Sequence, residues 1–317
     1  MSARRRVAVI GGGRNCEHEV GLATAASVRR ALDPRRYDVV PLTIGRDGSW
    51  SSDGSPLAFA DAVAVLAACD VAFPAVHGPH GEDGTLAALC ELAGVPYVGA
   101  GVRGGALAMD KWATKLVAAA LGIRVAPGMV VASVDELVPV RLPAVVKPVA
   151  AGSSHGVTLV RSAAQLVPAA RAALELDTRV LVEELVVGRE VDVAVLERAD
   201  GTRVAGPPLE VVVPSGRLFD TEAKYDGSAD FRLPAVVSDV EGKELEEAAL
   251  AMFDALGCSG VARVDFFLTR SGPVLNEVNT MPGLTEQSQV PKMFAAAGLA
   301  YPRLLDELVT GALARVG

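Results

Sequence analysis

The sequence predicts an α/β protein with a parallel sheet near its N-terminus. Short apolar, β-branched runs alternate with longer segments of helical periodicity, and several of these runs lead directly into glycine-rich or polar loops. Strands that alternate with helices in this way build parallel sheets, and ligands bind beyond the carboxyl ends of such strands. A chain of 317 residues, 50% of them hydrophobic, buries a sizeable core, and its length predicts roughly two or three domains.

Composition and charge exclude several classes of protein. The net charge of −8 argues against a general binder of nucleic acid or of anionic membranes, and no apolar run approaches the roughly 18–20 residues of a membrane span. The four cysteines are far apart and form no Cys-x-x-Cys pair, which indicates a reducing compartment. The N-terminus passes from one short strand directly into glycines, unlike a signal peptide, so we expect a cytoplasmic protein.

The N-terminal segment begins a βα unit that lacks the common nucleotide-binding motifs. A strand predicted at 6–10 leads into three glycines and a helix predicted at 16–32. The dinucleotide fingerprint requires a third glycine where Cys16 stands, which argues against a dehydrogenase, and no P-loop motif occurs. Glu17 opens the predicted helix, where an acidic residue is either simple capping or part of a ligand site.

Two further buried strands are predicted at 39–44 and 71–76, separated by a polar loop at 51–55 and helical segments. The second strand leads into HGPHGEDG, residues 77–84, and then into a helix predicted at 85–92. This loop therefore lies where ligands bind in a parallel sheet. The spacing of His77 and His80, with two acidic residues after them, resembles a metal site. Nothing else with ligand spacing lies nearby, so we do not expect zinc.

The middle of the chain predicts a flap. Asp110 has the features of a helix N-cap and Gly122 those of a helix stop. Strands predicted at 143–147 and 157–160 then enclose a loop rich in Gly and Ser, with Lys147 at its root. Such a loop either closes over phosphates, which its backbone N–H groups contact, or is a flexible hairpin.

The remaining elements follow the same two periodicities. They are a helix at 163–174, strands at 180–183, 190–196 and 209–213, a polar loop at 219–231, a helix at 240–256, a β-hairpin at 261–268 and 273–278, and helices at 291–297 and 301–314.

The hairpin near the C-terminus carries a group of polar side chains on one face. Side chains alternate along a strand, so Arg263 shares a face with Asp265, and Glu277 shares one with Asn279. If the strands pair, two carboxylates and an amide oxygen converge beside a guanidinium. Such hard oxygen ligands suit Mg²⁺ bound to nucleotide phosphates. The alternative is an ordinary solvated face of a hairpin.

Six blocks of sequence, in order along the whole chain, resemble the D-alanine–D-alanine ligase family of the ATP-grasp fold. They are GGGRNCEHEV, HGPHGEDG, GVPYVGAGV with MDK, VVKP with GSSHG, EAKY, and RVDF with NEVNTMPGLTEQS. The resemblance implies three α/β subdomains with ATP between the second and third: an N-terminal Rossmann-like unit at 1–101, a central unit with the flap at 102–187, and a C-terminal unit at 188–317. It also implies a homodimer.

The resemblance further implies an activity, in which one D-alanine is converted to an acyl phosphate by ATP and then joined to a second D-alanine for peptidoglycan synthesis. Nucleotide contacts would come from Lys111, Lys147, Glu183, Val186, Glu190 and Lys224. Two Mg²⁺ ions, or Mn²⁺ in their place, would be held by Asp265, Glu277 and Asn279.

The same resemblance assigns residues to the reacting groups. Arg263 and the backbone N–H of Gly283 would stabilise the tetrahedral intermediate. Glu17 would bind the ammonium of the first substrate within a network that includes Ser153 and Tyr225. In addition, His77 would lie near the first substrate and Ser288 would bind the carboxylate of the second. The tyrosine favours an amine acceptor, because relatives that accept D-lactate typically lack it.

Several positions depart from the family pattern. Gly21 stands where serine is usual, and Ala150, Ala151 and His155 change the flap. Gln287 and Gln289 flank Ser288, where other residues are common. These departures leave open a relative that joins other amino acids. A nucleotide-binding relative without catalysis is the remaining alternative, against which the full set of hairpin residues argues.

Overall fold

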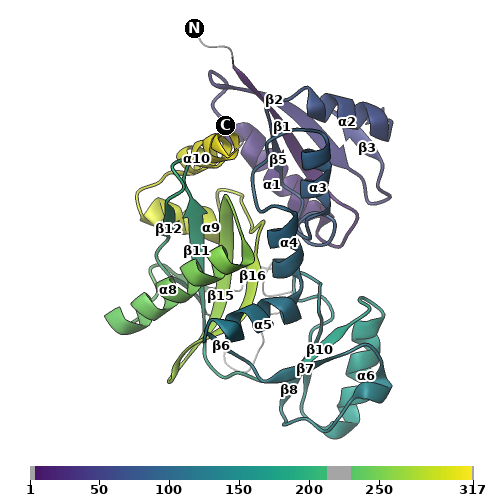
Figure 1. The fold of residues 1–317 in the computed structure, drawn as a ribbon, viewed down its shortest axis with the longest axis vertical. Coiled ribbons are helices and arrows are strands. Elements are labelled where there is room, and N and C mark those ends of the chain that lie inside the picture. The colour runs from purple at the N-terminus through teal and green to yellow at the C-terminus, as the bar shows by residue number, and fades with distance from the viewer. Residues whose placement is uncertain (1–3, 213–229, 316–317) are drawn as a thin grey trace.

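The computed structural model describes residues 4–212 and 230–315, which form three sheets stacked along the long axis of the molecule (Figure 1). The α/β class predicted from the sequence is confirmed. In Figure 1 the N-terminal sheet lies at the top, a large sheet occupies the middle, and the small sheet from the centre of the chain lies at the bottom. The chain therefore passes from the top unit along the middle one to the bottom unit and then returns to the middle.

The N-terminal sheet has the strand order β4-β3-β2-β1-β5. Its three long strands are parallel, as predicted, because the helices α1 (His18–Ala31) and α2 (Phe59–Ala67) connect them. Helix α3 follows the third parallel strand and has the predicted bounds, Thr85–Leu92. The strands are β1 (Arg5–Gly12), β2 (Tyr37–Ile44), β3 (Trp50–Ser52), β4 (Ser55–Leu57) and β5 (Val71–Pro74).

The polar loop predicted at 51–55 is wrong, because these residues form the β3–β4 hairpin. Ser52 pairs with Ser55 across a two-residue turn of Asp53 and Gly54, whose φ angles are 46° and 78°. Positive φ at both central residues is the turn that matches the twist of a hairpin, and Asp-Gly is one of its preferred sequences. The polar residues were therefore the turn and its flanks, and the strands were too short for a periodicity to show.

The central sheet is antiparallel with the order β7-β10-β8-β9. Strands β8 and β9 enclose residues 149–157, so the predicted flap is the connection of a hairpin. Helix α6 (Ala163–Leu174) packs its alanines and Leu166 on this sheet. The other elements are β7 (Gly128–Val131), η1 (Val134–Glu136), β8 (Ala144–Pro148), β9 (Thr158–Val160) and β10 (Val180–Glu184).

The third sheet has the order β14-β13-β11-β15-β16-β6, with β12 paired to β11. Its centre is the predicted C-terminal hairpin, β15 and β16, beside which β11 runs antiparallel. Of the predicted polar loop at 219–231, only the last two residues are described, and these lie in β14. The strands are β6 (Arg124–Val125), β11 (Arg189–Glu197), β12 (Arg203–Ala205), β13 (Leu209–Val212), β14 (Asp230–Arg232), β15 (Val261–Thr269) and β16 (Gly272–Asn279).

Helices cover both faces of the third sheet. Helix α8 (Asp239–Leu256) packs with α4 (Val102–Met109) and α5 (Lys111–Ala120) on one face, in a core that includes Phe253 and Phe266. On the other face, α9 (Gln289–Ala296) and α10 (Tyr301–Ala314) share a core with the N-terminal sheet. Residues 102–125 therefore contribute to the third sheet's layers, and the three-unit division of the chain stays a prediction.

The predicted capping at the start of α5 is confirmed. Asp110 ends α4 and caps α5, where its side chain accepts a hydrogen bond from the N–H of Ala113. After this helix, Gly122 has a positive φ of 74° that suits a helix stop. Within the described ranges, 4–212 and 230–315, no helix is both long and apolar enough to span a membrane.

Candidate active site

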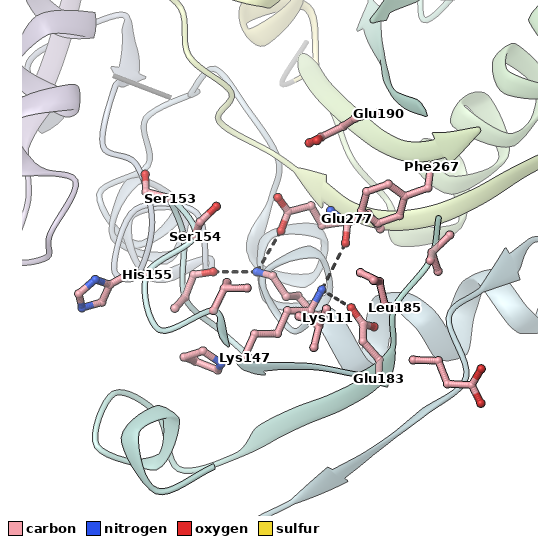
Figure 2. A pocket seen from close by; sticks show the side chains of 18 residues that line it. Lys111, Lys147, Ser153, Ser154, His155, Glu183, Leu185, Glu190, Phe267 and Glu277 are labelled. Atoms are coloured by element: carbon pink, nitrogen blue, oxygen red, sulfur yellow. Dashed lines mark hydrogen bonds and ion pairs between the residues drawn. The ribbon is translucent and has the colours of Figure 1, made fainter. Parts of the chain in front are cut away.

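Two neighbouring cavities contain the residues that the sequence predicts for the site. The first, which we call the lysine cavity, lies between the central and third sheets, beneath the flap (Figure 2). The second, the acceptor cavity, is lined from the N-terminal loops, the flap and the third sheet. Ser153 and Glu277 line both. Of the predicted nucleotide residues, the lysine cavity contains Lys111, Lys147, Glu183, Val186 and Glu190.

Two lysines project into the lysine cavity from different elements. Lys147 Nζ, at the end of β8, lies 2.5 Å from Glu183 Oε1 and donates a hydrogen bond of 3.2 Å to Asn276 Oδ1. Lys111 Nζ, at the start of α5, donates to the Ala151 carbonyl at 2.7 Å and lies 3.1 Å from Glu277 Oε2. Figure 2 shows both ammonium groups between the flap and the strands of the third sheet. The cavity thus has a concentrated positive charge beneath a glycine-rich loop, which suits phosphate groups.

Glu183 lies on β10 between two ammonium groups. Lys147 contacts its Oε1, and Lys115 Nζ is 2.9 Å from its Oε2. Burial would raise the pKa of this carboxyl group, but Lys147 and Lys115 outweigh it and hold the pKa below its ordinary value. Burial also lowers the pKa of Lys115, which Glu183 partly opposes. Lys115 was not predicted as a site residue, because nothing nearby in the chain indicates its partner.

A bulge in the C-terminal hairpin places two consecutive side chains on one cavity. The register pairs Asp265 with Glu277 but Phe266 with Leu275, so Asn276 is an extra residue in β16. A bulge of this kind turns the inserted side chain toward the same side as its neighbour. Asn276 and Glu277 therefore both line the lysine cavity, whereas strict alternation would place them on opposite faces.

The convergence predicted for the hairpin is present. Arg263 pairs with Asn279 and Asp265 with Glu277 across the strands. The Arg263 guanidinium donates two hydrogen bonds of 2.7 Å to the buried Asp265 carboxylate, and Asn279 Nδ2 donates a third at 3.0 Å. Burial opposes the charge of Arg263, yet Asp265 and its neighbours raise the pKa of the guanidinium well above the ordinary value. Asp265 is buried and its three polar neighbours are half-buried, so the face is a shielded polar cluster rather than a solvated one.

The chemistry of this cluster fits a divalent cation such as Mg²⁺. Asp265, Glu277 and Asn279 provide carboxylate and amide oxygens from one face of the hairpin. Glu277 lines both cavities and Asn279 lines the acceptor cavity, whereas Asp265 lies buried behind them. No group of three or more His, Cys, Asp or Glu side chains with the arrangement of a metal site occurs in the described part of the chain.

The flap contacts the N-terminal loop at Glu17. Ser153 Oγ donates a hydrogen bond of 2.5 Å to Glu17 Oε1, as the predicted network requires. Among the described residues, the buried Oε2 atom of Glu17 has no hydrogen-bond partner. A Cβ atom on Gly78 or Gly152 would lie 2.4 or 2.3 Å from that oxygen, so a side chain at either position would displace the Glu17 carboxylate. The Oε2 atom is therefore enclosed on two sides, and Glu17 is among the residues that line the acceptor cavity.

His77 lies on the wall of the acceptor cavity in its neutral form. Its Nδ1–H donates to the Met281 carbonyl at 2.8 Å, since a carbonyl only accepts. Nε2 then accepts from the Thr24 hydroxyl at 2.9 Å. Burial lowers the pKa of the ring below its ordinary value, although the nearby Glu17 opposes this shift. With both nitrogens engaged, the ring shapes the cavity and connects the N-terminal sheet to the loop after β16.

Glu82 connects the same two segments. Its carboxylate oxygens accept hydrogen bonds from the N–H groups of Gly78 at 2.9 Å and Met281 at 3.0 Å. Burial, followed by repulsion from Glu17, raises the pKa of Glu82 to about 7, and the two backbone donors oppose the shift. From the sequence, Glu82 was considered only as a possible metal ligand, whereas its contacts join the N-terminal unit to the third sheet.

The loop after β16 forms the far wall of the acceptor cavity. Ser288 Oγ lies 3.1 Å from the backbone N of Thr285 and 2.7 Å from its hydroxyl oxygen. A Cβ atom on Gly283 would approach Ser288 Oγ to 3.1 Å, so the two predicted residues are adjacent. Gln289 donates a hydrogen bond of 2.9 Å to the buried Asp192, which also lies 3.6 Å from Arg263.

The departures from the family pattern have different structural settings. Gly21 packs its helix against β1, where a Cβ atom would lie 2.4 Å from the Gly12 carbonyl, and it is not among the lining residues of either cavity. His155 lies at the exposed rim of the lysine cavity, and Figure 2 shows its ring directed away from the two lysines. Gln287 and Gln289 both line the acceptor cavity. Of these departures, the glutamines are therefore the ones that line the acceptor cavity.

The structure brings together every predicted site residue that it describes. Lys224 and Tyr225 lie outside the described residues. Four contributing side chains were not predicted as site residues, or were given another role, because their partners are remote or depend on the bulge: Glu82, Lys115, Asp192 and Asn276.

Comparisons with known proteins agree with this architecture. Residues 128–310 match the family model described as the D-ala D-ala ligase C-terminus, and residues 6–64 and 51–100 match the D-ala D-ala ligase N-terminus. A relative named D-alanine--D-alanine ligase from Nocardia farcinica is 42% identical over 358 aligned positions, which cover 99% of each chain.

Two solved structures share the whole fold. The VanG D-Ala:D-Ser ligase from Enterococcus faecalis superposes with a TM-score of 0.87 at 34% identity, covering 98% of this chain and 100% of that one. The D-alanine--D-alanine ligase from Bacillus anthracis, complexed with ATP, gives 0.82 at 27% identity, covering 98% of each. The fold is that of an ATP-grasp enzyme. Within that class, the chain belongs to the D-alanine–D-alanine ligase family.

Proposed function

We propose that the protein is an ATP-dependent ligase that joins two D-alanine molecules into D-alanyl-D-alanine for peptidoglycan synthesis in the cytoplasm. The observation that carries this proposal is the junction of two cavities at Ser153 and Glu277, beside Arg263 on the wall of the acceptor cavity. One cavity offers two lysines beneath a glycine-rich flap, and the other offers a carboxylate and a guanidinium around a space suited to a small zwitterion. Membership of the ligase family supports the same activity.

In the proposed reaction, a carboxylate oxygen of the first D-alanine attacks the γ-phosphorus of ATP, and ADP leaves. The amine of the second D-alanine then attacks the carbonyl carbon of the resulting acyl phosphate and loses a proton, after which inorganic phosphate leaves. Two bound small molecules react mainly because they are held in the correct orientation. The enzyme's contribution is therefore positioning and charge stabilisation, which the two adjoining cavities supply.

The nucleotide is assigned to the lysine cavity. Lys111 and Lys147 neutralise phosphate oxygens, and Lys224 joins them near the γ-phosphate. Glu183 and Val186 contact the adenine, and Glu190 holds the ribose hydroxyls. The support is that five of these six residues line one cavity, with the two lysines close to the flap's backbone.

A divalent cation completes the nucleotide site in this proposal. Asp265, Glu277 and Asn279 would hold Mg²⁺, as two ions with Mn²⁺ as a substitute, because their oxygens share one hairpin face. When bound, the ions screen the repulsion between the attacking carboxylate and the phosphate. Arg263 already holds the Asp265 carboxylate in place, so this carboxylate does not have to reorient when a cation binds.

The reacting carbonyl is assigned to Arg263 and the N–H of Gly283. Both residues line the acceptor cavity, and hydrogen bonds to the oxyanion form where the charge develops. Since Asp265 holds the guanidinium through two of its nitrogens, the side chain is oriented before a substrate arrives. Such orientation avoids the rearrangement that a solvated side chain would need.

The amino-acid ends are assigned to the outer parts of the acceptor cavity. Glu17 binds the ammonium of the first D-alanine through the oxygen that lacks a partner among the described residues. Ser153 and Tyr225 complete that network, and His77 forms the adjoining wall. Ser288 binds the carboxylate of the second D-alanine.

Release of ADP in the presence of single amino acids tests the proposal. We expect turnover that requires D-alanine and yields the dipeptide, and none with L-alanine. If D-alanine leaves the ATP hydrolysis rate at its background value, the proposed function is wrong.

A different second substrate is the competing candidate, which Gln289 favours. Its side chain lines the acceptor cavity. Since Nε2 donates a hydrogen bond to Asp192, the amide oxygen is the atom of Gln289 that accepts a hydrogen bond from a ligand. An added hydroxyl, as in D-serine, is one group that such an oxygen binds. Competition between D-alanine, D-serine and D-lactate for a fixed first substrate distinguishes these acceptors.

The quaternary structure and domain division are further proposals. We infer a homodimer from family membership, which light scattering of the purified protein tests directly. The units 1–101, 102–187 and 188–317 remain our proposed division, with 102–125 packed on the third unit. Limited proteolysis after which residues 102–125 stay associated with the fragment 188–317 supports this arrangement.

A further inference from the structure

One buried carboxylate in the lysine cavity has two ammonium partners. Glu183 Oε1 lies 2.5 Å from Lys147 Nζ, and Oε2 lies 2.9 Å from Lys115 Nζ. The side chains of Lys115, Glu183 and Lys147 are 3%, 5% and 7% exposed, so solvent screens the three charges poorly. The group carries a net charge of +1, one more cation than the carboxylate requires.

The two lysines differ in what they can reach. Lys147 lines the cavity and also contacts Asn276, whereas Lys115 is not among the lining residues. Lys115 lies one helical turn after Lys111 on α5, so both project from one face of that helix. Apart from Glu183, Lys115 Nζ has no polar partner within the described part of the chain. Its only described interaction is therefore behind the nucleotide site, not in it.

A nucleotide phosphate at Lys147 would compete with Glu183 for the same ammonium. With a single lysine, that competition would leave an uncompensated buried carboxylate, which is strongly unfavourable. With two lysines, one stays with Glu183 while the other turns to the phosphate. The second cation thus removes the electrostatic penalty of releasing the first.

We propose that Lys115 is a positioning residue of the nucleotide site, which stays paired with Glu183 and thereby frees Lys147 to bind nucleotide phosphates. The inference rests on the proposed nucleotide-binding function of the cavity and assigns a role to a residue that does not touch the nucleotide. This role of Lys115 differs from that of a purely structural ion pair in one respect. The benefit of Lys115 depends on the presence of a phosphate.

The test compares ADP with adenosine, which lacks phosphates, in calorimetric titrations with MgCl₂ present. In Lys115→Met, which keeps the length of the side chain without its charge, we expect the Kd of ADP to rise about tenfold or more, as for the removal of a charged contact. The Kd of adenosine should change less than twofold by the same argument. Lys243→Met is the matched control, because Lys243 forms an exposed pair with Glu247 on α8. It should leave both values unchanged.

A double variant separates charge compensation from packing. In Lys115→Met with Glu183→Gln there is no carboxylate to compensate, so Lys147 is free and the ratio of the adenosine Kd to the ADP Kd should return to the wild-type value. This ratio is informative even if the single variant does not fold, because any weakening of adenine binding by Glu183→Gln affects both ligands alike.

Either of two results overturns the proposal: ADP and adenosine weakened by the same factor in Lys115→Met, or a ratio that stays low in the double variant. A wild-type protein that binds neither ligand would instead refute the proposed nucleotide site. Failure of the inference and failure of the proposed function are thus distinguishable.

Discussion

The lysine cavity and the acceptor cavity are built on different principles. In the lysine cavity, charged side chains pair with one another, as Lys147 does with Glu183 within the central sheet and Lys111 of α5 does with Glu277 of the third sheet. In the acceptor cavity, side chains bridge segments that are remote in sequence and often end on backbone groups, as His77 does on Met281. A ligand must therefore exchange partners in the first cavity, whereas the second depends on how three segments come together.

The largest expected effect separates turnover from nucleotide binding. Arg263→Met removes the proposed oxyanion donor from the acceptor cavity, and we expect turnover to fall by about 10²–10³-fold or more. The Kd of ADP should change little, because Arg263 does not line the lysine cavity. Steady-state kinetics and calorimetry on the same preparation measure both quantities. Arg263→Lys, which keeps a charge beside Asp265, is the control variant. If the turnover of Arg263→Met equals that of wild type, the assignment of Arg263 is wrong.

The next effect tests the bridges of the acceptor cavity through pH. Glu82 has a pKa of about 7 in the folded protein against an ordinary value of 4.5, so the folded state binds more protons between these values. Stability should therefore be unaffected by this group below pH 4.5, fall as the pH rises from 4.5 to 7, and then level off. The whole interval corresponds to about 3 kcal/mol.

Thermal unfolding of wild type and Glu82→Gln across pH 4.5–8 measures this contribution as a difference in slope. The Gln variant cannot ionise, so its stability should fall less over that interval, even though its amide satisfies the N–H groups of Gly78 and Met281 less well. Equal slopes for the two proteins would show that Glu82 titrates in the ordinary range.

The contrast between the cavities also explains how far the sequence could predict the fold. Helices with strong periodicity and clear ends, such as 85–92, 163–174 and 301–314, were predicted to the residue. The β3–β4 hairpin was missed because three-residue strands carry no periodicity, although the Asp53-Gly54 pair was a turn signal. Strand β6 has two residues and exists only because β16 lies beside it.

The site divides in the same manner. Lys147 and the hairpin residues belong to local motifs with a chemical pattern, and the resemblance to a family added Lys111 and brought these parts together. Asn276 could not be predicted, because strict alternation hides a bulge. Glu82 and Met281 are 199 residues apart, and Asp192 and Gln289 are 97 apart, so only the folded chain places them in contact.

Lys147→Met tests the first cavity with a smaller expected effect. Removal of one charged contact to phosphate should raise the Kd of ADP about 10- to 100-fold. The KM of D-alanine should stay within about twofold, because the acceptor cavity does not include Lys147. Calorimetry and initial rates at saturating ATP give the two values. A variant whose ADP affinity equals that of wild type would remove Lys147 from the phosphate site.

The smallest expected effect lies where the two cavities meet. Ser153 lines both and donates to Glu17, so Ser153→Ala should loosen the flap's contact with the acceptor cavity and raise the KM of D-alanine about tenfold, as for one hydrogen bond to a charged group. Ser154→Ala is a close control. Its φ of 56° resembles the 49° of Ser153, so both alanines meet the same backbone strain, but Ser154 lines the lysine cavity alone.

The pattern of KM values across these two variants decides whether the cavities act together. If Ser153→Ala raises the KM of D-alanine and Ser154→Ala does not, the flap closes the acceptor cavity through Glu17. If both variants change only the KM of ATP, the flap serves the lysine cavity alone and the contact with Glu17 has no role in substrate binding. Because the two serines are adjacent in the chain, a general loosening of the flap would affect both variants equally, so only a difference between them indicates coupling.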